Sequence, residues 1–380
     1  SFDNYFGRLV ASGAYAPGEV DVPPADWALS DGNGGTVAPH PDTDYCFGVN
    51  HGWNDMHDDW NNGANDHFVT NNNPNGQRVM GYEDDTVIPF YYALAKNFAI
   101  GDRYFASVMT STWPNRLFLM AATSFGIGDN SWVSIDTTEH PVANLMQELD
   151  DAGRTWRDYT DGPHMIEFFL HYGYKGSTLA NLFDVRCNLF DDIAKDELPD
   201  VAFVMGNETS ETSDEGPSAL PGVGGQLVEQ IIRALWASPA WAHTAVFITY
   251  DENGGMADHV PPAVACAPDD YAPHDEQGMP FTGDFQHTGF RVPFIVVSPY
   301  AKPHYVSHTT YDHASLARFV EVRFGLKALT NRDANATPPL DMFDFAHPAF
   351  LTPPTIDAHT VVPPAVLQQC NQTYAPYTCE

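Results

Sequence analysis

The residues best suited to chemistry follow an apolar run in the second half of the chain. The β-branched and aromatic residues 245–250 predict a buried strand, and two adjacent carboxylates, Asp251 and Glu252, follow it directly. A second acid and an imidazole, Asp258 and His259, come shortly after a pair of glycines. Because ligands bind outside the carboxyl ends of strands in open α/β sheets, this segment predicts a site for a hard metal ion or for proton transfer. A polar strand-to-loop transition is the alternative interpretation.

A second candidate site lies where a hydroxyl-rich run leads into Trp-Pro-Asn-Arg. Thr112 stands just before the expected start of a helix, where the helix dipole and free backbone N–H groups favour an anion such as phosphate. Its hydroxyl is therefore a candidate nucleophile. Asn115 and Arg116 are candidate substrate-binding residues, since a guanidinium offers a charged fork to phosphoryl oxygens. An ordinary helix start with a Pro in its first turn is the alternative.

Four histidines fall in polar, turn-rich segments near the ends of expected strands, namely His51, His259, His308 and His313. Histidines in such places bind metals, hold phosphate oxygens or protonate a leaving group. The chain contains 16 histidines, so most of them must be structural, and some of these four could simply cap a helix or donate hydrogen bonds.

Strands and helices alternate in the second half of the chain, which predicts an α/β fold with a mostly parallel central sheet and helices on both faces. The expected strands cover residues 201–205, 245–250 and 292–298, and the expected helices cover 88–98, 117–123, 142–152, 227–237 and 314–324. No repeat or linker divides the chain. We therefore expect residues 1–345 to form one catalytic domain and the Pro-rich residues 346–380 to form a tail packed on it.

The composition restricts the partners. Acidic residues outnumber basic ones by 50 to 17, which gives a net charge of −33 over 380 residues. Such a surface repels nucleic acid and anionic lipid, although zwitterionic lipid and small phosphate esters remain compatible with a locally positive pocket. The apolar content of 43% is ample for a core, and no apolar run is long enough to predict a membrane span.

The five cysteines show no C-x-x-C spacing, which disfavours a zinc ribbon or a redox motif. Cys370 and Cys379 flank a polar stretch and are expected to form a disulfide, which fits a secreted or periplasmic protein. The odd number leaves at least one free thiol, which we expect to be buried. Whether Cys46 pairs with Cys187 or with Cys266 stays open.

A series of short motifs gives the chain a family resemblance. In chain order they are Ser-Phe-Asp-Asn-Tyr-Phe-Gly, Trp-Asn-Asn-Gly, Ile-Pro-Phe-Tyr-Tyr-Ala-Leu-Ala, Asp-Arg-Tyr-Phe, Thr-Trp-Pro-Asn-Arg, Tyr-Asp-Glu-Asn-Gly-Gly, Asp-His-Val-Pro-Pro, Arg-Val-Pro, Ser-His-Thr-Thr-Tyr-Asp-His-Ala-Ser and Phe-Asp-Phe. This order resembles the bacterial phosphoesterase family that holds the non-haemolytic phospholipases C and a related acid phosphatase. The family looks like a branch of the alkaline phosphatase superfamily, and the resemblance implies an alkaline-phosphatase-like fold over residues 1 to about 345.

The resemblance implies a role for each motif residue. Thr112 matches the nucleophile, and Asp251 and Glu252 match the metal-binding acids, with Thr112 also facing the metal. Oxygen ligands favour Ca²⁺, Mg²⁺ or Mn²⁺, and added imidazoles would admit Zn²⁺. A metal beside Thr112 would lower the pKa of its hydroxyl, and a phosphothreonine intermediate that water later releases would follow.

The resemblance also covers the four histidines, and the sequence departs from the family pattern in two places. His51 matches a histidine near the phosphoryl group, and His259, His308 and His313 match pocket histidines. In the family, a Glu-Asn pair sits just before the first motif, whereas this sequence starts at the motif itself. Where family members often carry Asp-Glu-His-Pro, residues 214–217 read Asp-Glu-Gly-Pro, so a substrate-pocket histidine is expected to be missing.

The preferred function from the sequence is phospholipase C-like cleavage of a phospholipid, with transient contact at a lipid surface. One alternative is an acid phosphatase that acts on small phosphomonoesters. A non-enzymatic alternative is a secreted protein that binds Ca²⁺ with a decayed site. Turnover of one ester type or the other, or of neither, distinguishes the three.

Overall fold

The computed structural model describes residues 1–43, 45, 47–132, 144–169, 180–207 and 213–362. Its central sheet has four strands in the order β11 (Tyr305–Ser307), β5 (Ala99–Gly101), β10 (Ile295–Val297) and β9 (Val246–Ile248). The β-branched and aliphatic residues of β5 and β10 are fully buried, as expected for strands covered on both faces.

Strand direction corrects the expectation of a mostly parallel sheet. β11 runs parallel to β5, but β10 runs antiparallel to both of its neighbours, with Ile295 opposite Ile100 and Ile248. A parallel neighbour would require a crossover connection, usually a helix. Residues 249–294, which join β9 to β10, contain no helix, so the chain returns in the opposite direction.

Three further sheets lie beside the central one. β7 (Leu182–Phe183), β6 (Trp156–Tyr159) and β8 (Val201–Val204) form a parallel sheet in that order, which places a strand where residues 201–205 predicted one. Two small pairs occur near the N-terminus, formed by β1 (Leu29–Ser30) with β2 (Thr36–Val37) and by β3 (His40–Pro41) with β4 (Gly81–Tyr82).

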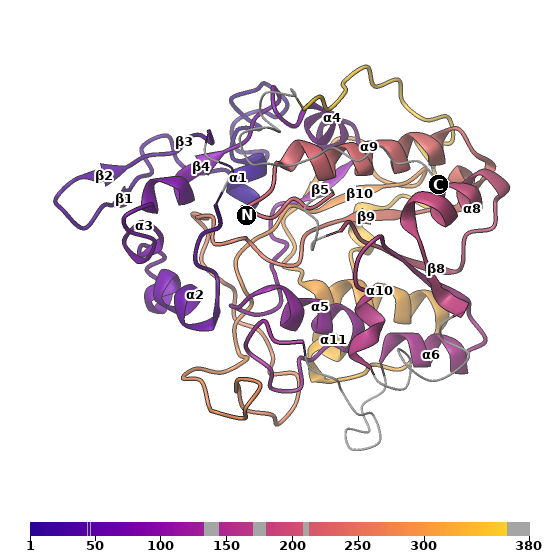
Figure 1. Cartoon of the computed structure of the whole chain (residues 1–380). Helices are drawn as coiled ribbons and strands as arrows, with labels where there is room; N and C mark the ends of the chain where they lie inside the picture. The colour runs from indigo at the N-terminus through magenta and orange to yellow at the C-terminus, as the bar shows by residue number, and fades with distance from the viewer. Residues whose placement is uncertain (44, 46, 133–143, 170–179, 208–212, 363–380) are drawn as a thin grey trace.

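Helices cover both faces of the central sheet, which confirms the α/β class. Figure 1 shows α4 (Pro89–Asn97) and α9 (Pro221–Trp236) on one side, and α5 (Thr112–Ala121) and α10 (His313–Phe324) on the other. α9 begins six residues before the expected Leu227, in a glycine-rich stretch whose low helix propensity hid its first turns. Within the described ranges, no helix is long and apolar enough to cross a bilayer.

The remaining helices are short. The α-helices are α1 (Phe2–Phe6), α2 (Trp53–Trp60), α3 (Phe68–Asn71), α6 (Leu145–Asp151), α8 (Phe190–Lys195) and α11 (Asn331–Asn335). Single turns of 3₁₀ or π type cover Asn61–Gly63, Gly76–Met80, Met165–Phe168, Val185–Leu189, Pro239–His243 and Leu340–Met342.

The segment after residue 345 packs along α9. Arg233 donates to the carbonyl oxygens of Ile356 and Ala358, at 3.2 and 2.8 Å. Glu229 accepts from the backbone N–H of Thr360 at 2.8 Å and contacts the His359 ring at 2.7 Å. These contacts fasten the part of the tail that the structure describes, up to residue 362.

The cysteines are partly accounted for. Cys187 is disulfide-bonded, and Cys266 is free. The free thiol is exposed rather than buried as expected, because it lies in the long irregular segment between β9 and β10. Cys46, Cys370 and Cys379 lie outside the described residues, so the expected disulfide in the tail stays a prediction.

Burial dominates the titration of several carboxyl groups. Asp59 is fully buried, and although Asn71 donates to its Oδ1 at 3.0 Å, burial raises its pKa to about 8. Burial likewise raises the pKa values of Glu83 and Glu321 to about 8. In the unfolded chain such groups titrate near pH 4, so the folded protein holds these protons more tightly.

The free energy of unfolding should therefore fall as the pH rises from about 4 to about 8, because the folded state binds more protons than the unfolded state over this range. Replacing Asp59 by Asn should remove part of this slope. Urea unfolding should show that the free energy of unfolding of D59N, taken relative to that of the wild type, increases by on the order of 1–2 kcal/mol from pH 5 to pH 8. The exposed-site control D26N should keep the wild-type slope, and an unchanged slope in D59N would contradict the assignment.

Candidate functional site

One cavity brings most of the sequence-predicted residues together. It has a volume of about 1180 Å³, and its wall includes His51, Thr112, Asn115, Arg116, Asp251, Glu252 and His313. These residues come from the loop before α2, from the first turns of α5 and α10, and from the segment that follows β9. His259 and His308 do not belong to the residues that line it.

Thr112 occupies the first turn of α5 rather than the position before the helix. Its neighbour Ser111 is the N-cap, and the Ser111 hydroxyl donates to the carbonyl oxygen of His51 at 3.2 Å. Thr112 is partly exposed to the cavity, where the positive end of the helix dipole lies. The start of α5 can therefore hold both an anion and a hydroxyl nucleophile.

The loop before Thr112 is held by Asn115. The Asn115 side chain is fully buried, and its Oδ1 accepts from the backbone N–H of Val108 at 3.0 Å. Its Nδ2 donates to the carbonyl oxygens of Thr110 and Ser111, at 2.9 and 3.0 Å. Both ends of the amide are thus used to fix the approach to Thr112. Its predicted contact with substrate stays a prediction.

The acidic pair stands at the end of β9, as predicted. Arg116 reaches across from α5, and its Nε and Nη2 lie 3.2 and 3.1 Å from Asp251 Oδ2. Glu252 is more deeply buried, and its Oε2 accepts from the backbone N–H of Gly254 at 2.5 Å. Burial, offset in part by His51, raises the pKa of Glu252 to about 7.

The two glycines after the pair permit a close approach of three loops. Gly254 and Gly255 have φ values of +64° and +72°, which residues other than glycine rarely adopt. A Cβ on Gly254 would collide with Pro217, and one on Gly255 would collide with the carbonyl oxygen of Asn50. Glycine is therefore required to bring the acidic pair against the His51 loop.

His313 lies under Asp251. Its Nε2 is 2.7 Å from the carbonyl oxygen of Asp251, and its Nδ1 is 3.0 Å from the hydroxyl of Tyr104. Burial lowers the pKa of His313, so the neutral ring donates through Nε2 and accepts from Tyr104 through Nδ1. This arrangement lets His313 position the backbone of the acidic pair.

His51 faces Glu252. Its Nδ1 is 2.6 Å from the carbonyl oxygen of Val49, which fixes a proton on Nδ1 and leaves Nε2 for the cavity. Nε2 is 4.0 Å from Glu252 Oε1, and the charge of Glu252 raises the pKa of His51 despite burial. His51 is therefore the described imidazole best placed to exchange a proton with a ligand in the cavity.

His259 belongs to a separate buried network. Its ring nitrogens lie 2.7 Å from Asp3 and 3.1 Å from Asp21, and these hydrogen bonds outweigh burial and raise its pKa to about 9. Asp3, Asp258 and His259 are close enough to hold a metal ion. Arg291, however, donates to Asp3 at 2.8 Å and to Asp258 at 2.9 Å, so a guanidinium already neutralises the group. The structure thus gives His259 an ion pair that fastens α1.

His308 also lies away from the cavity. Its Nδ1 is 2.9 Å from both carboxylate oxygens of the buried Asp102, and its side chain is 60% exposed. The catalytic roles of His259 and His308 stay predictions, and their positions give both residues structural partners instead.

Two acids that the sequence did not assign to the site lie at its edge. Asp214 lines the cavity, and its pKa is raised by burial and by the neighbouring charge of Asp251, against the effect of Arg116. Glu215 accepts from the hydroxyls of Tyr5, Tyr91 and Tyr250, each at 2.6 Å. In the sequence, the adjacent carboxylates Asp214 and Glu215 were the available sign of a site. The fold was needed to show that they lie near the end of β9.

The cavity offers oxygen donors of the type that a hard divalent cation prefers. Asp251, Glu252 and Asp214 offer carboxylate oxygens and Thr112 a hydroxyl to the same cavity, although within the described residues only Asp3, Asp258 and His259 bring three such ligand atoms within 4.8 Å of one another. Glu252 in particular is buried with a raised pKa, as expected for a carboxylate that lacks a full counter-charge. Ca²⁺, Mg²⁺ and Mn²⁺ prefer such oxygen ligands, and His51 is the nearby imidazole that would admit Zn²⁺.

Comparison with known proteins places this chain in a class of phosphoric ester hydrolases. The model of the Phosphoesterase family matches residues 1–327, and the chain belongs to this family. It is 30% identical over 409 residues to the non-hemolytic phospholipase C of Burkholderia pseudomallei, covering 89% of this chain and 55% of that protein. It is also 30% identical over 442 residues to phospholipase C B of Mycobacterium tuberculosis, covering 99% of this chain and 83% of that protein.

Similarity to solved structures is weaker. The murine ectonucleotide pyrophosphatase/phosphodiesterase 5 aligns with a TM-score of 0.41 at 12% identity, covering 64% of this chain and 91% of that chain. A 2-O glycosaminoglycan sulfatase aligns with a TM-score of 0.43 at 11% identity, covering 70% of each chain.

Replacing Glu215 by Gln should loosen the edge of the site. An amide nitrogen cannot accept a hydrogen bond, so at least one of the three tyrosine hydroxyls would face another donor. We expect the free energy of unfolding at pH 8 to fall by about 1–3 kcal/mol in urea titrations. The exposed-site control E197Q should stay within about 0.5 kcal/mol of the wild type. Equal stability of E215Q and E197Q would show that the tyrosine cluster contributes little.

Proposed function

We propose that this protein is a metal-dependent phosphoesterase that cleaves phospholipid phosphodiesters in the manner of a phospholipase C. The observation that carries the proposal is that Thr112 lines the same cavity as Asp251, Glu252 and Arg116. Two of its relatives carry the name phospholipase C. Zwitterionic head groups suit the protein better than anionic ones, because its net charge of −33 repels anionic surfaces.

In the proposed first step, Thr112 Oγ1 attacks phosphorus. The Oγ1–P bond forms, the P–O bond to diacylglycerol breaks, and the Thr112 proton passes to solvent. The protonated Nε2 of His51 supplies a proton to the leaving alkoxide, which departs as diacylglycerol. The start of α5 and the guanidinium of Arg116 stabilise the charge on the remaining phosphoryl oxygens.

In the second step, water attacks the phosphothreonine. His51, now neutral, takes a proton from that water, the P–O bond to Thr112 breaks, Thr112 Oγ1 takes a proton from solvent, and the phosphorylated head group leaves. A divalent cation held by Asp251, Glu252 and Thr112 would lower the pKa of the threonine hydroxyl and offset phosphoryl charge when bound.

The cellular location belongs to the same proposal. Cys187 is disulfide-bonded, and disulfides persist in oxidising compartments. This supports export of the protein to the periplasm or the medium, where zwitterionic phospholipid and small phosphate esters are available as substrates.

Removing the Thr112 hydroxyl should abolish turnover. T112A should lower kcat for p-nitrophenylphosphorylcholine by about 10³-fold or more, whereas T112S should retain much of it. Rapid quenching of the wild type followed by intact-mass spectrometry should reveal a transient phosphorylated adduct that T112A lacks. Activity of T112A near the wild-type level would exclude this residue as the nucleophile. Faster turnover of p-nitrophenyl phosphate than of the choline ester would favour the acid phosphatase alternative.

Removing the metal should also abolish turnover. Treatment with a chelator should lower activity at least about tenfold, and adding Ca²⁺, Mn²⁺ or Zn²⁺ separately should show which ion restores it. E252Q should require about 10–100-fold more metal for half-maximal recovery, whereas the exposed-site control E197Q should recover like the wild type. Full activity in the metal-stripped protein would contradict the metal-dependent mechanism. Absence of activity with every ion and both esters would favour the binding-protein alternative.

A further inference from the structure

The cavity at Thr112 is much larger than a phosphoryl group and a small head group require. Pockets for drug-sized ligands typically measure about 300–1,000 Å³, and this one measures about 1180 Å³. Its wall continues from the acidic pair along residues 243–254 and along residues 198–206. The cavity is therefore an extended cleft, with the phosphoryl site as one part of it.

The cleft separates the edges of two sheets. β9 is the last strand of the central sheet and β8 is the last strand of the parallel sheet, and within the described chain neither pairs with a strand on its outer side. Both strands lead toward the chemical site at their carboxyl ends, β9 directly into Asp251 and β8 into the segment before Asp214. At about 3.3 Å per residue, residues 198–206 extend for at most roughly 30 Å.

Many side chains that line the cleft beyond the phosphoryl site are apolar, although polar ones such as Thr244 and Thr249 also line it. α9 contributes from one face and α10 from the other, with β9 and β8 between them. The main contributors are Leu227, Ile231, Phe319, Val320, Phe247 and Val204. Several of them remain partly exposed, and Val204 is 40% exposed. Apolar surface left open to water inside a cleft is typical of a site for an apolar ligand.

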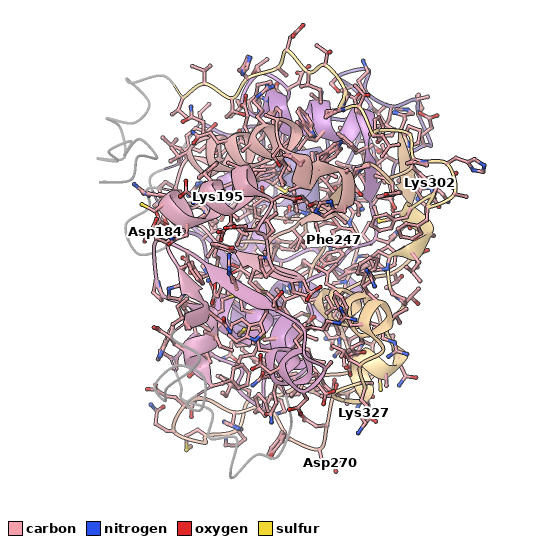
Figure 2. The ribbon with its side chains drawn as sticks, turned by 90° about the vertical axis from the view of Figure 1, so that its right-hand side faces the viewer. Asp184, Lys195, Phe247, Asp270, Lys302 and Lys327 are labelled. Atoms are coloured by element: carbon pink, nitrogen blue, oxygen red, sulfur yellow. The ribbon has the colours of Figure 1, made fainter. Side chains whose placement is uncertain are left out.

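Phe247 of β9 lines the cleft. Figure 2 views the molecule from the right-hand side of Figure 1 and labels Phe247 near the centre of that side, between the upper and the lower helices. Asp200 and His243 line the cleft near the amino ends of β8 and β9, at the end opposite the phosphoryl site. Charged groups thus lie at the two ends, and apolar side chains are numerous between them.

We propose that the cleft between β8 and β9 binds the acyl chains of a diacylglycerol-based substrate while its phosphodiester lies at Thr112. This inference rests on the proposed phosphodiesterase function and extends it to the apolar part of the substrate. The occupant must be apolar over most of its length and must carry a phosphoester at one end. A phospholipid meets both requirements. A peptide strand could pair with the open edges, but it would bring polar groups against α9 and α10 and would leave the phosphoryl site unexplained.

The test compares esters with and without acyl chains. We expect kcat/KM for phosphatidylcholines in mixed micelles to rise at least tenfold from dihexanoyl to dipalmitoyl chains. V204E places a carboxylate in the cleft at a partly exposed strand position and should reduce this preference at least tenfold. Its turnover of p-nitrophenylphosphorylcholine, which has no acyl chain, should stay at the wild-type level and thereby show that the variant is folded.

The matched control is V322E, since Val322 is also a partly exposed valine, at 47%, and does not line the cleft. V322E should behave like the wild type with every substrate. A second cleft variant, A202F, narrows the cleft without adding charge and should shift the preference toward shorter chains. Unchanged chain-length preference in both V204E and A202F would overturn the acyl-chain site.

The outcomes separate this inference from the proposed function. If the wild type hydrolyses neither p-nitrophenylphosphorylcholine nor any phosphatidylcholine, the phosphodiesterase function fails. If it hydrolyses the soluble ester but shows no preference for longer chains, the function stands and the acyl-chain site fails. Native mass spectrometry of T112A incubated with dipalmitoylglycerol adds a measurement without turnover. We expect T112A to bind one lipid molecule and the double variant T112A/V204E to bind none. Equal binding by the two variants would overturn the inference.

Discussion

Holding two adjacent carboxylates at the end of a strand, with Glu252 buried and Asp251 partly exposed, is the constraint on which the rest of the site depends. A buried carboxylate is costly unless charge or hydrogen bonds compensate it. Asp251 receives the guanidinium of Arg116, and His313 holds its backbone from below. Glu252 receives one backbone N–H and faces His51 at 4.0 Å, which leaves it the less compensated of the two. The loops that surround β9 are thus arranged by the need to neutralise this pair, and the nucleophile is brought to it by the same helix that supplies Arg116.

Local sequence predicted the elements that carry strong local signals. Helices α4 and α10 and the strand β8 lie where periodicity and flanking residues placed them, and the acidic pair follows β9 as expected. The direction of β10 could not be read from the sequence, because it depends on how the long segment after β9 returns. The early start of α9 was hidden by glycines whose cost is met by tertiary packing.

The sequence predicted which types of residue form the candidate site, but it did not show which individual residues come together there. Thr112, His51 and His313 meet the acidic pair, whereas His259 and His308 are occupied by Asp3, Asp21 and Asp102 at other places in the fold. A histidine beside an acid in the sequence does not show which distant acid it will contact. Asp214 shows the converse, because its place at the cavity depends on a loop that comes close to β9 only through the glycines of that segment.

The open edges of β8 and β9 also bear on how separate copies of this protein behave when they meet. An exposed strand edge is a template for pairing with another molecule and a common start of aggregation. Here the two edges lie along one cleft instead of projecting outward, with α9 and α10 as its walls. A neighbouring copy cannot align a flat strand against either edge without entering the cleft, and the large negative charge keeps such copies apart. Each of the two strands thus keeps one edge unpaired within the described chain, and the cleft restricts access of another copy to that edge.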